Sequence, residues 1–216
     1  MTPLRVFYAD EHLVVVDKPS GLLSVPGRGS GKADCAVSRA AAEFGWIREA
    51  HRLDQPTSGL LLLARSPEAH RRLSAAFAER RVRKTYIAVC ASRPFGGEGG
   101  RGAVAAGRIV LRQRLDPENR PRQVVDEEQG KEAVTLWRVL DSGMERCRLE
   151  LRPLTGRTHQ LRLACAEAGA PILGDALYAP PGTADAADRL LLHAASIRFP
   201  APFGGGRIVI ESPAPF

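Results

Sequence analysis

The sequence predicts an α+β fold, formed as one compact domain over residues 1–216. Short apolar runs of strand length recur along the chain and are separated by glycine, proline and aspartate, which are typical turn residues. Three helical segments are interspersed among these runs. No repeat, linker or change of composition divides the chain. Strands mixed with scattered helices favour an α+β architecture over a layered α/β one.

The first half is expected to hold four strands and two helices. Apolar residues in 34–44 recur at the spacing of one helical face, with Asp34 as N-cap and Gly45 as the stop. Ser66 and Pro67 have the residue types of an N-cap and a first helical position, which begins a second helix. The expected strands are 4–10, 13–18, 59–66 and 84–91.

The second half is expected to contain two loops, a hairpin, a third helix and two final strands. We expect a long glycine-rich loop over 92–107 and a charged, irregular excursion over 111–130. Helical spacing predicts the third helix over 158–168, closed by Gly169. The expected strands are 131–140 and 145–154, which form the hairpin, followed by 190–199 and 207–212.

The composition favours a polyanionic partner. The net charge is +7, and 27 of the 31 basic residues are arginine, whose planar fork suits phosphate groups and stacks on bases. The alternative, which composition leaves open, is that a GC-rich coding sequence simply enriches arginine. No apolar run has the length of a membrane helix, and the first residues lack the features of a signal peptide. We therefore expect an intracellular, cytoplasmic protein.

The segment HRLDQPTSGL, residues 51–60, is the first candidate site. Asp54 follows Arg52 closely and precedes a Pro-Thr-Ser-Gly turn, which restricts the backbone. A cation nearby favours an ionised carboxylate, and an ionised, fixed carboxylate is able to act as nucleophile or base. A simple turn with a surface arginine would have the same sequence.

The segment LTGRTHQLRL, residues 154–163, is the second candidate site. Gly156 allows an unusual backbone, and Arg157 is expected at the start of the third helix. A cation there opposes the helix dipole, so that a carboxylate from elsewhere in the chain would be a suitable partner. A solvent-facing arginine is the alternative.

Three other segments carry residues suited to RNA. Tyr86 lies in a strand behind basic residues, as suits stacking on a base, although a core tyrosine would look the same. Arg120 and Arg122 lie on the charged excursion and are suited to phosphates. Lys18 precedes a tight turn and is either an RNA contact or a structural lysine.

Several motifs of cofactor-dependent chemistry are missing from the sequence. There is no phosphate-binding Gly-Lys-Ser/Thr loop, no G-x-S-x-G elbow and no metal-spaced His/Cys cluster. The four cysteines form no C-x-x-C pair and are expected to be buried thiols. We therefore expect chemistry without metal or cofactor.

Taken together, these segments resemble the RluA family of pseudouridine synthases. The resemblance rests on HRLDQPTSGLLLLA, RKTYIAVC, LRPLTGRTHQLRLA, GAPILGDALY and LLLHAASIRFP, which occur in the family's order. DKPSGLLSVPG and NRPRQ are most similar to the subgroup of ribosomal large subunit pseudouridine synthase A. The resemblance implies a bent, mostly antiparallel mixed sheet with a central cleft and no separate S4 RNA-binding domain.

The resemblance also implies roles for individual residues. It implies that Asp54 is the essential aspartate, Arg157 its partner and Tyr86 the aromatic that stacks on the target base. Arg52 would fill the space left by flipped nucleotides, and Leu161 would line the uracil pocket. The remaining expected substrate contacts are His51, Thr57, Arg120, Arg122 and Lys18.

The reaction implied is the isomerisation of uridine to pseudouridine in RNA. The subgroup acts on a hairpin-loop uridine of 23S rRNA and on a tRNA anticodon-loop uridine, so we expect RNA as the partner, with no DNA or membrane, and a monomer. Synthases for tRNA alone or for another rRNA site remain alternatives, as does a non-catalytic RNA-binding protein on the same scaffold.

Overall fold

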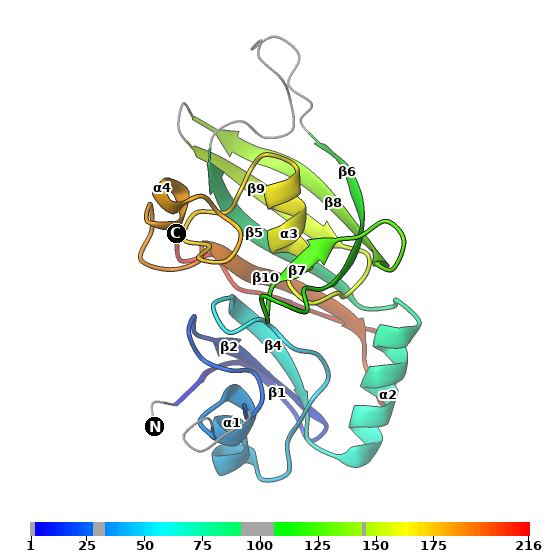
Figure 1. The fold of residues 1–216 in the computed structure, drawn as a ribbon. Helices are drawn as coiled ribbons and strands as arrows, with labels where there is room; N and C mark the ends of the chain where they lie inside the picture. The colour runs from blue at the N-terminus through cyan, green and yellow to red at the C-terminus, as the bar shows by residue number, and fades with distance from the viewer. Residues whose placement is uncertain (1–2, 28–32, 92–105, 144–145) are drawn as a thin grey trace. The chain divides into compact units, whose positions relative to one another are not determined.

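The computed structural model describes residues 3–27, 33–91, 106–143 and 146–216, and it divides into two compact units (Figure 1). Unit 1 comprises Met1–Lys84 and His193–Phe216, and unit 2 comprises Thr85–Leu192. The chain thus leaves the first unit once and returns to it. No helix in the described ranges is long and apolar enough to cross a membrane.

Unit 1 contains a mixed sheet in which β4 occupies a central place. β2 pairs with β4 antiparallel over six residues, whereas β10 pairs with β4 in parallel through His193 and Ala194. β1 pairs with β2, β3 with β4 and β11 with β10, all antiparallel. The strands are β1 (Arg5–Ala9), β2 (Leu13–Lys18), β3 (Arg48–Glu49), β4 (Ser58–Ala64), β10 (Leu192–Pro200) and β11 (Arg207–Glu211).

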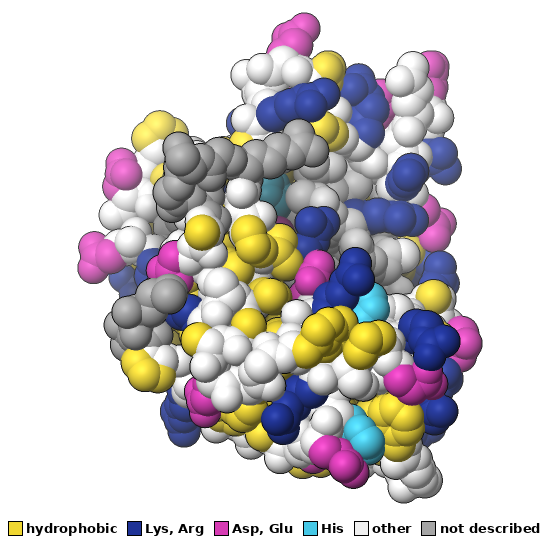
Figure 2. All heavy atoms as spheres, turned by 90° about the horizontal axis from the view of Figure 1, so that it is seen from below, with side chains coloured by type: hydrophobic (Ala, Val, Ile, Leu, Met, Phe, Trp, Pro, Cys, Tyr) yellow, Lys and Arg dark blue, Asp and Glu magenta, His cyan; other side chains and the backbone are white. Residues whose placement is uncertain are grey.

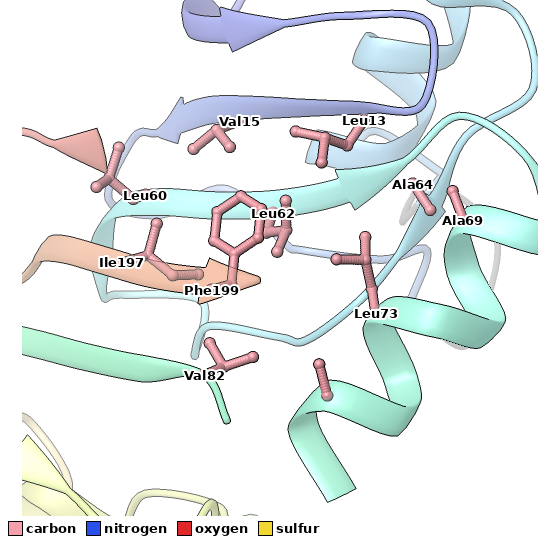
Figure 3. Packing of buried hydrophobic residues seen from close by; sticks show 11 residues of the cluster. Leu13, Val15, Leu60, Leu62, Ala64, Ala69, Leu73, Val82, Ile197 and Phe199 are labelled. Carbon is pink, nitrogen blue, oxygen red and sulfur yellow. The ribbon is translucent and has the colours of Figure 1, made fainter. Parts of the chain in front are cut away.

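Burial of the leucine run explains why β4 holds this place. All seven of its residues are buried, which a strand covered on both faces requires. On one face Leu60 and Leu62 pack with Leu73 of α2 (Pro67–Ala78) and with Phe199 of β10, as Figure 3 shows. Ala69, Leu73 and Ala76 therefore form the inward face of α2.

The helix ends are set by local chemistry, with one correction. Ser66 accepts a hydrogen bond from Ala69 N and Pro67 is the first residue of α2, as predicted. The first helix, α1, spans Ala36–Phe44 and not 34–44. Its N-cap is Cys35 rather than Asp34, because the Asp34 carboxylate instead accepts two hydrogen bonds from Arg39.

Unit 2 contains an antiparallel sheet with the strand order β5-β9-β8-β6-β7. The predicted hairpin of β8 and β9 is confirmed. The predicted irregular excursion over 111–130 is wrong for residues 111–115 and 123–125, which form strands, whereas the residues between and after them form turns. β6 pairs antiparallel with β8 over eight residues and with β7 over three, so its arginines lie on a genuine strand. The strands are β5 (Arg83–Ala91), β6 (Ala106–Leu115), β7 (Gln123–Val125), β8 (Lys131–Ser142) and β9 (Arg146–Pro153).

Residues 106 and 107 of the predicted 92–107 loop begin β6, and residues 92–105 lie outside the described residues. Two helices complete unit 2: α3 (Gln160–Glu167) contacts β8, β6 and β9, and α4 is the short segment Pro181–Ala184. Arg162 of α3 forms a buried bidentate ion pair with Asp175, at 2.8 and 2.5 Å. All four cysteines are buried free thiols, as expected.

Gly59 of β4 pairs with Ala194 of β10. Its φ is +110°, and a Cβ atom there would lie 2.5 Å from the Ala194 carbonyl oxygen. Gly59→Ala should therefore combine backbone strain with a backbone clash, at a cost of about 3 kcal/mol or more. We expect the melting temperature to fall by about 10 °C. Gly205→Ala, at a position with open space, is the control and should melt like the wild type.

The buried side chain of His51 should make the free energy of unfolding depend on pH. Burial, reinforced by the nearby charge of Lys84, lowers the pKa of His51 to about 3. Its Nε2 accepts a hydrogen bond from Leu62 N at 3.1 Å, so protonation there would oppose two N–H groups. The unfolded chain binds this proton near pH 6.5, whereas the folded chain does not, so the free energy of unfolding should fall as the pH drops from 6.5 toward 3.

His51→Gln keeps an acceptor for Leu62 N but cannot titrate. Urea unfolding at pH 7, 6, 5 and 4.5 should give a shallower loss of stability for this variant, by at most about 1.4 kcal/mol per pH unit. Parallel pH profiles of the two proteins would contradict the prediction.

Candidate active site

The backbone around Asp54 is held by the loop that follows β2. Ser24 Oγ donates to the Leu53 carbonyl oxygen at 2.7 Å and accepts from Leu53 N at 3.0 Å. On the other side of Asp54, the Gln55 carbonyl oxygen accepts a hydrogen bond from Gly21 N at 2.9 Å. The residues before and after Asp54 are therefore fixed to one loop.

The same loop also reaches the turn beyond Asp54. Ser20 Oγ donates to the Pro56 carbonyl oxygen at 2.7 Å, and Gln55 Nε2 donates to the Gly21 carbonyl oxygen at 3.0 Å. Within the turn itself, Thr57 N donates to the Asp54 carbonyl oxygen at 3.0 Å. The predicted restriction of this turn is present, but it comes from residues 20–24 as well as from Pro56 and Gly59.

Lys18 belongs to this support and does not present its charge to a substrate. Its side chain is completely buried, and its ammonium group donates to the carbonyl oxygens of Pro19, Leu22 and Gln55 at 3.0, 2.7 and 3.0 Å. The sequence left open an RNA contact or a structural lysine. Its burial and its three backbone acceptors favour the structural lysine over the RNA contact.

The other expected site residues of unit 1 differ in exposure. Arg52 is exposed and Asp54 is half-buried, as suits residues that meet a substrate. Thr57 is buried, and its Oγ1 has no hydrogen-bond partner within the described structure. His51 packs on the ring of Phe77, with centroids 5.2 Å apart, and supports β4 through Leu62. His51 therefore connects β4 with α2, and Thr57 joins the Asp54 turn through its backbone N–H, which donates to the Asp54 carbonyl oxygen.

In unit 2, Gln160 organises the segment that carries Arg157. Its Oε1 accepts hydrogen bonds from Arg157 N at 3.0 Å and from Thr155 Oγ1 at 2.8 Å. Its Nε2 donates to the Val134 carbonyl oxygen at 2.9 Å and to Thr135 Oγ1 at 3.1 Å. One buried amide thus ties residues 155–157 to β8.

Arg157 itself lies outside the helix that was expected to begin with it. α3 starts at Gln160, and the residue with left-handed backbone is His159, at φ +54°, and not Gly156. The Arg157 side chain is exposed, and its Nε donates to the Glu132 carbonyl oxygen at 3.0 Å. This bond orients the guanidinium group while leaving its other N–H groups for further partners.

Tyr86 and Leu161 provide buried apolar surface in unit 2. Tyr86 is 6% exposed on β5, where it pairs with Leu151 of β9. Leu161 is 7% exposed at the second position of α3. Such placements suit the side of a base pocket rather than a free surface contact.

Arg120 and Arg122 lie in the tight turn between β6 and β7. Both are exposed, and the turn is fixed because Asp116 N donates to the Arg122 carbonyl oxygen and Arg122 N to that of Asn119. The Arg122 guanidinium lies over the Tyr178 ring, 5.4 Å from its centroid. Tyr178 OH is 2.8 Å from His159 Nδ1, so the turn is connected to the start of α3.

The structure therefore groups the predicted residues by unit. Asp54 and its supports lie together in unit 1, and Arg157, Leu161 and the arginine turn are connected in unit 2. Sequence reasoning missed Ser20, Ser24, Gln160 and Tyr178, which act through hydrogen bonds to distant backbone. Gln160 is only 4% exposed in the structure. The one signal for it in the sequence was a polar residue within a helical segment. Among the described residues, no three His, Cys, Asp or Glu are grouped to hold a metal.

Comparison with known proteins gives consistent matches over the chain. The family described as RNA pseudouridylate synthase matches residues 12–167. The dual-specificity RNA pseudouridine synthase RluA of Pasteurella multocida (strain Pm70) is 42% identical over 214 residues, covering 99% of this chain and 94% of that protein. The protein of the same description from Escherichia coli (strain K12) is 39% identical with the same coverage.

Solved structures agree with the sequence matches. The human RNA pseudouridylate synthase domain containing 1 superposes with a TM-score of 0.79 at 28% identity, covering 100% of this chain and 87% of that one. The human RNA pseudouridylate synthase domain containing 4 gives 0.74 at 25% identity, covering 98% and 88%. The predicted fold class and the resemblance read from the motifs are confirmed, and this chain belongs to the RNA pseudouridylate synthase family.

Proposed function

We propose that this chain isomerises uridine to pseudouridine in two kinds of RNA hairpin loop, one in 23S rRNA and one in the tRNA anticodon arm. The observation that carries the proposal is the 39–42% identity, over 94% of their length, to relatives described as dual-specificity synthases. Synthases for tRNA alone or for another rRNA site are the alternatives. The chain would act as a cytoplasmic monomer with residues 1–216 forming one catalytic domain.

In this proposal Asp54 is the catalytic carboxylate. The reaction breaks the N1–C1′ bond, turns the uracil and rejoins it to the ribose through C5. C5 loses its proton in this step, and N1 takes up a proton. Hydrolytic glycosidases use two carboxylates, because a water must be activated and a leaving group protonated. An isomerase that returns the same base needs neither, so one carboxylate suffices. Asp54 acts either as the nucleophile at C1′ or as the base at C2′.

The hydrogen bonds around Asp54 support this role. A half-buried carboxylate whose two neighbours are bonded through their backbones loses little freedom when a flipped uridine binds. Preorganisation of this kind is a main source of catalytic rate. Lys18, His51 and Thr57 would contribute by positioning Asp54 and not by touching RNA.

The other roles follow from exposure and residue type. Arg157 would be the cation that stabilises the Asp54 carboxylate, Tyr86 the stacking partner of the base and Leu161 part of the uracil pocket. Arg52 is exposed beside Asp54 and would occupy the space that the flipped nucleotide leaves. Arg120 and Arg122 would contact phosphates of the hairpin. Flipping costs only a few kcal/mol, and less in a loop than in a duplex.

Asp54→Asn tests the catalytic role because it removes the charge with little change of shape. We expect single-turnover pseudouridine formation to fall at least about 10³-fold, since an amide cannot act as the nucleophile or the base. The dissociation constant for RNA should stay within about threefold. The measurement is carbodiimide labelling and primer extension on unmodified tRNA and a 23S rRNA fragment.

Asp188→Asn, at an exposed position of unit 2, is the control and should behave like the wild type. Near-normal turnover by Asp54→Asn would eliminate the assignment. Binding of both RNAs by the wild type without modification of either would instead favour the RNA-binding alternative.

Arg157→Ala tests the proposed partner of Asp54. Loss of the guanidinium should lower the single-turnover rate about 100-fold, because the reacting carboxylate loses a charge-assisted contact. The melting temperature should change by only a few degrees, because the side chain is exposed and its one described hydrogen bond goes to a backbone carbonyl. Arg152→Ala, exposed on β9, is the matched control. Equal single-turnover rates for Arg157→Ala and Arg152→Ala would show that Arg157 has no role in the reaction.

A further inference from the structure

The basic charge of this chain is concentrated in one short segment of unit 1. Residues 65–84 contain seven basic and two acidic residues, a net charge of +5, while the whole chain has +7. This segment covers α2 and the turn that leads into β5. The function proposed above uses none of its arginines.

Five of these arginines are exposed. Arg71 and Arg72 lie in the middle of α2, Arg80 and Arg81 follow its C-terminal end, and Arg83 begins β5. In Figure 2, which views the molecule from below, dark-blue side chains recur along the right-hand side, where Figure 1 places α2. We call these five residues the α2 arginine surface.

A hollow in unit 1 lies within this surface. It has a volume of about 320 Å³ and is lined by Arg72, Ala75 and Arg81 on one side and by residues 200–202 on the other. Arg72 is held in place there, because its Nη1 donates to the Pro202 carbonyl oxygen at 2.9 Å and its guanidinium lies 4.3 Å from the Phe203 ring centroid. A fixed arginine at a hollow is preorganised for an anion, since less freedom is lost on binding.

Local structural roles account for only part of this charge. Glu68 pairs with Arg71 and Arg72, and Glu79 pairs with Arg81, so two carboxylates serve three arginines. Cations after the end of α2 complement its dipole, but Arg71 and Arg72 lie too far toward the start of the helix to do so. Solvent-exposed ion pairs of this kind are weak, so phosphate oxygens would compete for these guanidinium groups.

We infer that the α2 arginine surface is a second RNA contact, which binds the phosphate backbone of the substrate outside the flipped uridine, with one phosphate in the hollow between Arg72 and Arg81. The inference rests on the proposed function for the identity of the RNA. Phosphate contacts position an RNA without reading its sequence, so one such surface would serve both hairpins of a dual-specificity enzyme.

The test is a triple variant, Arg71→Gln, Arg80→Asn and Arg81→Gln. Asn is chosen at Arg80 because that residue has φ +56°, which asparagine tolerates. Arg72 is left intact because it packs on Phe203. At about 0.1 M salt we expect the dissociation constant for an unmodified RNA hairpin to rise about tenfold. The slope of log affinity against log salt should become shallower by about 2, since each lost phosphate contact contributes about 0.7–0.9.

The single-turnover rate at saturating RNA should stay within about twofold, because the reacting groups are untouched. A matched triple, Arg5→Gln, Arg198→Gln and Arg207→Gln, removes the same charge from exposed positions on β1, β10 and β11. It should change affinity less than about threefold. A third triple variant, Arg71→Lys, Arg80→Lys and Arg81→Lys, keeps the charge and should keep the salt slope.

If the two triple variants that remove charge lost RNA affinity equally, the loss would come from the lower net charge of the protein. That result would overturn the inference. An unchanged RNA affinity and salt slope for the Arg71, Arg80 and Arg81 variant would also overturn it. An acidic protein would then be the better candidate for a partner of this surface. RNA binding does not require turnover, so the experiments can refute the proposed function and the α2 arginine surface independently of each other. A wild type that binds RNA through this surface without forming pseudouridine would refute only the proposed function. A wild type that forms pseudouridine, together with a triple variant that binds normally, would refute only the surface.

Discussion

The buried ammonium group of Lys18 is the interaction on which the Asp54 segment depends. An ammonium removed from water costs several kcal/mol unless its donors are satisfied, and three carbonyl oxygens satisfy them here. Two of these belong to the loop after β2, and the third belongs to Gln55, directly after Asp54. The need to pair one buried charge therefore joins two segments that are 37 residues apart in the chain. Ser20, Gly21 and Ser24 then add neutral hydrogen bonds to the same junction.

In unit 2 a buried neutral group, the side-chain amide of Gln160, fixes the segment that carries Arg157. Gln160 is buried, and all the donors and acceptors of its side-chain amide that the structure describes are directed to β8 and to residues 155–157. A buried amide without partners would be costly, so these bonds hold the segment before α3 in one conformation. Arg157 therefore remains exposed while its backbone is fixed. Asp54 and Arg157 are thus accessible, whereas the side chains of Lys18, Ser24 and Gln160, which fix the backbone around them, are buried.

This separation also explains which substitutions are informative. Positioning residues such as Lys18 and Gln160 combine support of the site with support of the fold, so their loss would change both. The exposed arginines lie on strands, turns and helix surfaces whose cores do not need them. Effects on RNA binding are therefore cleanest at the exposed positions, where charge is removed and packing is not.

The sequence by itself determined the local structure and the family. The strands other than β3, β6 and β7 were predicted from the pattern of neighbouring residues. The start of α2 at Ser66 and Pro67 and the stop of α1 at Gly45 depend on equally local backbone preferences. The motifs that carry Asp54, Tyr86 and Arg157 were equally local.

Only the tertiary structure decided what depends on distant partners. The burial of Lys18 depends on the folded chain, because one of the three carbonyl oxygens that accept from its ammonium group belongs to Gln55, 37 residues further along the sequence. β6 is a strand despite its arginines because β8 and β7 pair with its two edges. Hydrogen bonds between segments far apart in the sequence do not change the spacing of apolar residues in either segment, so they cannot be predicted from that spacing. The support of the candidate site was therefore invisible until the chain was folded.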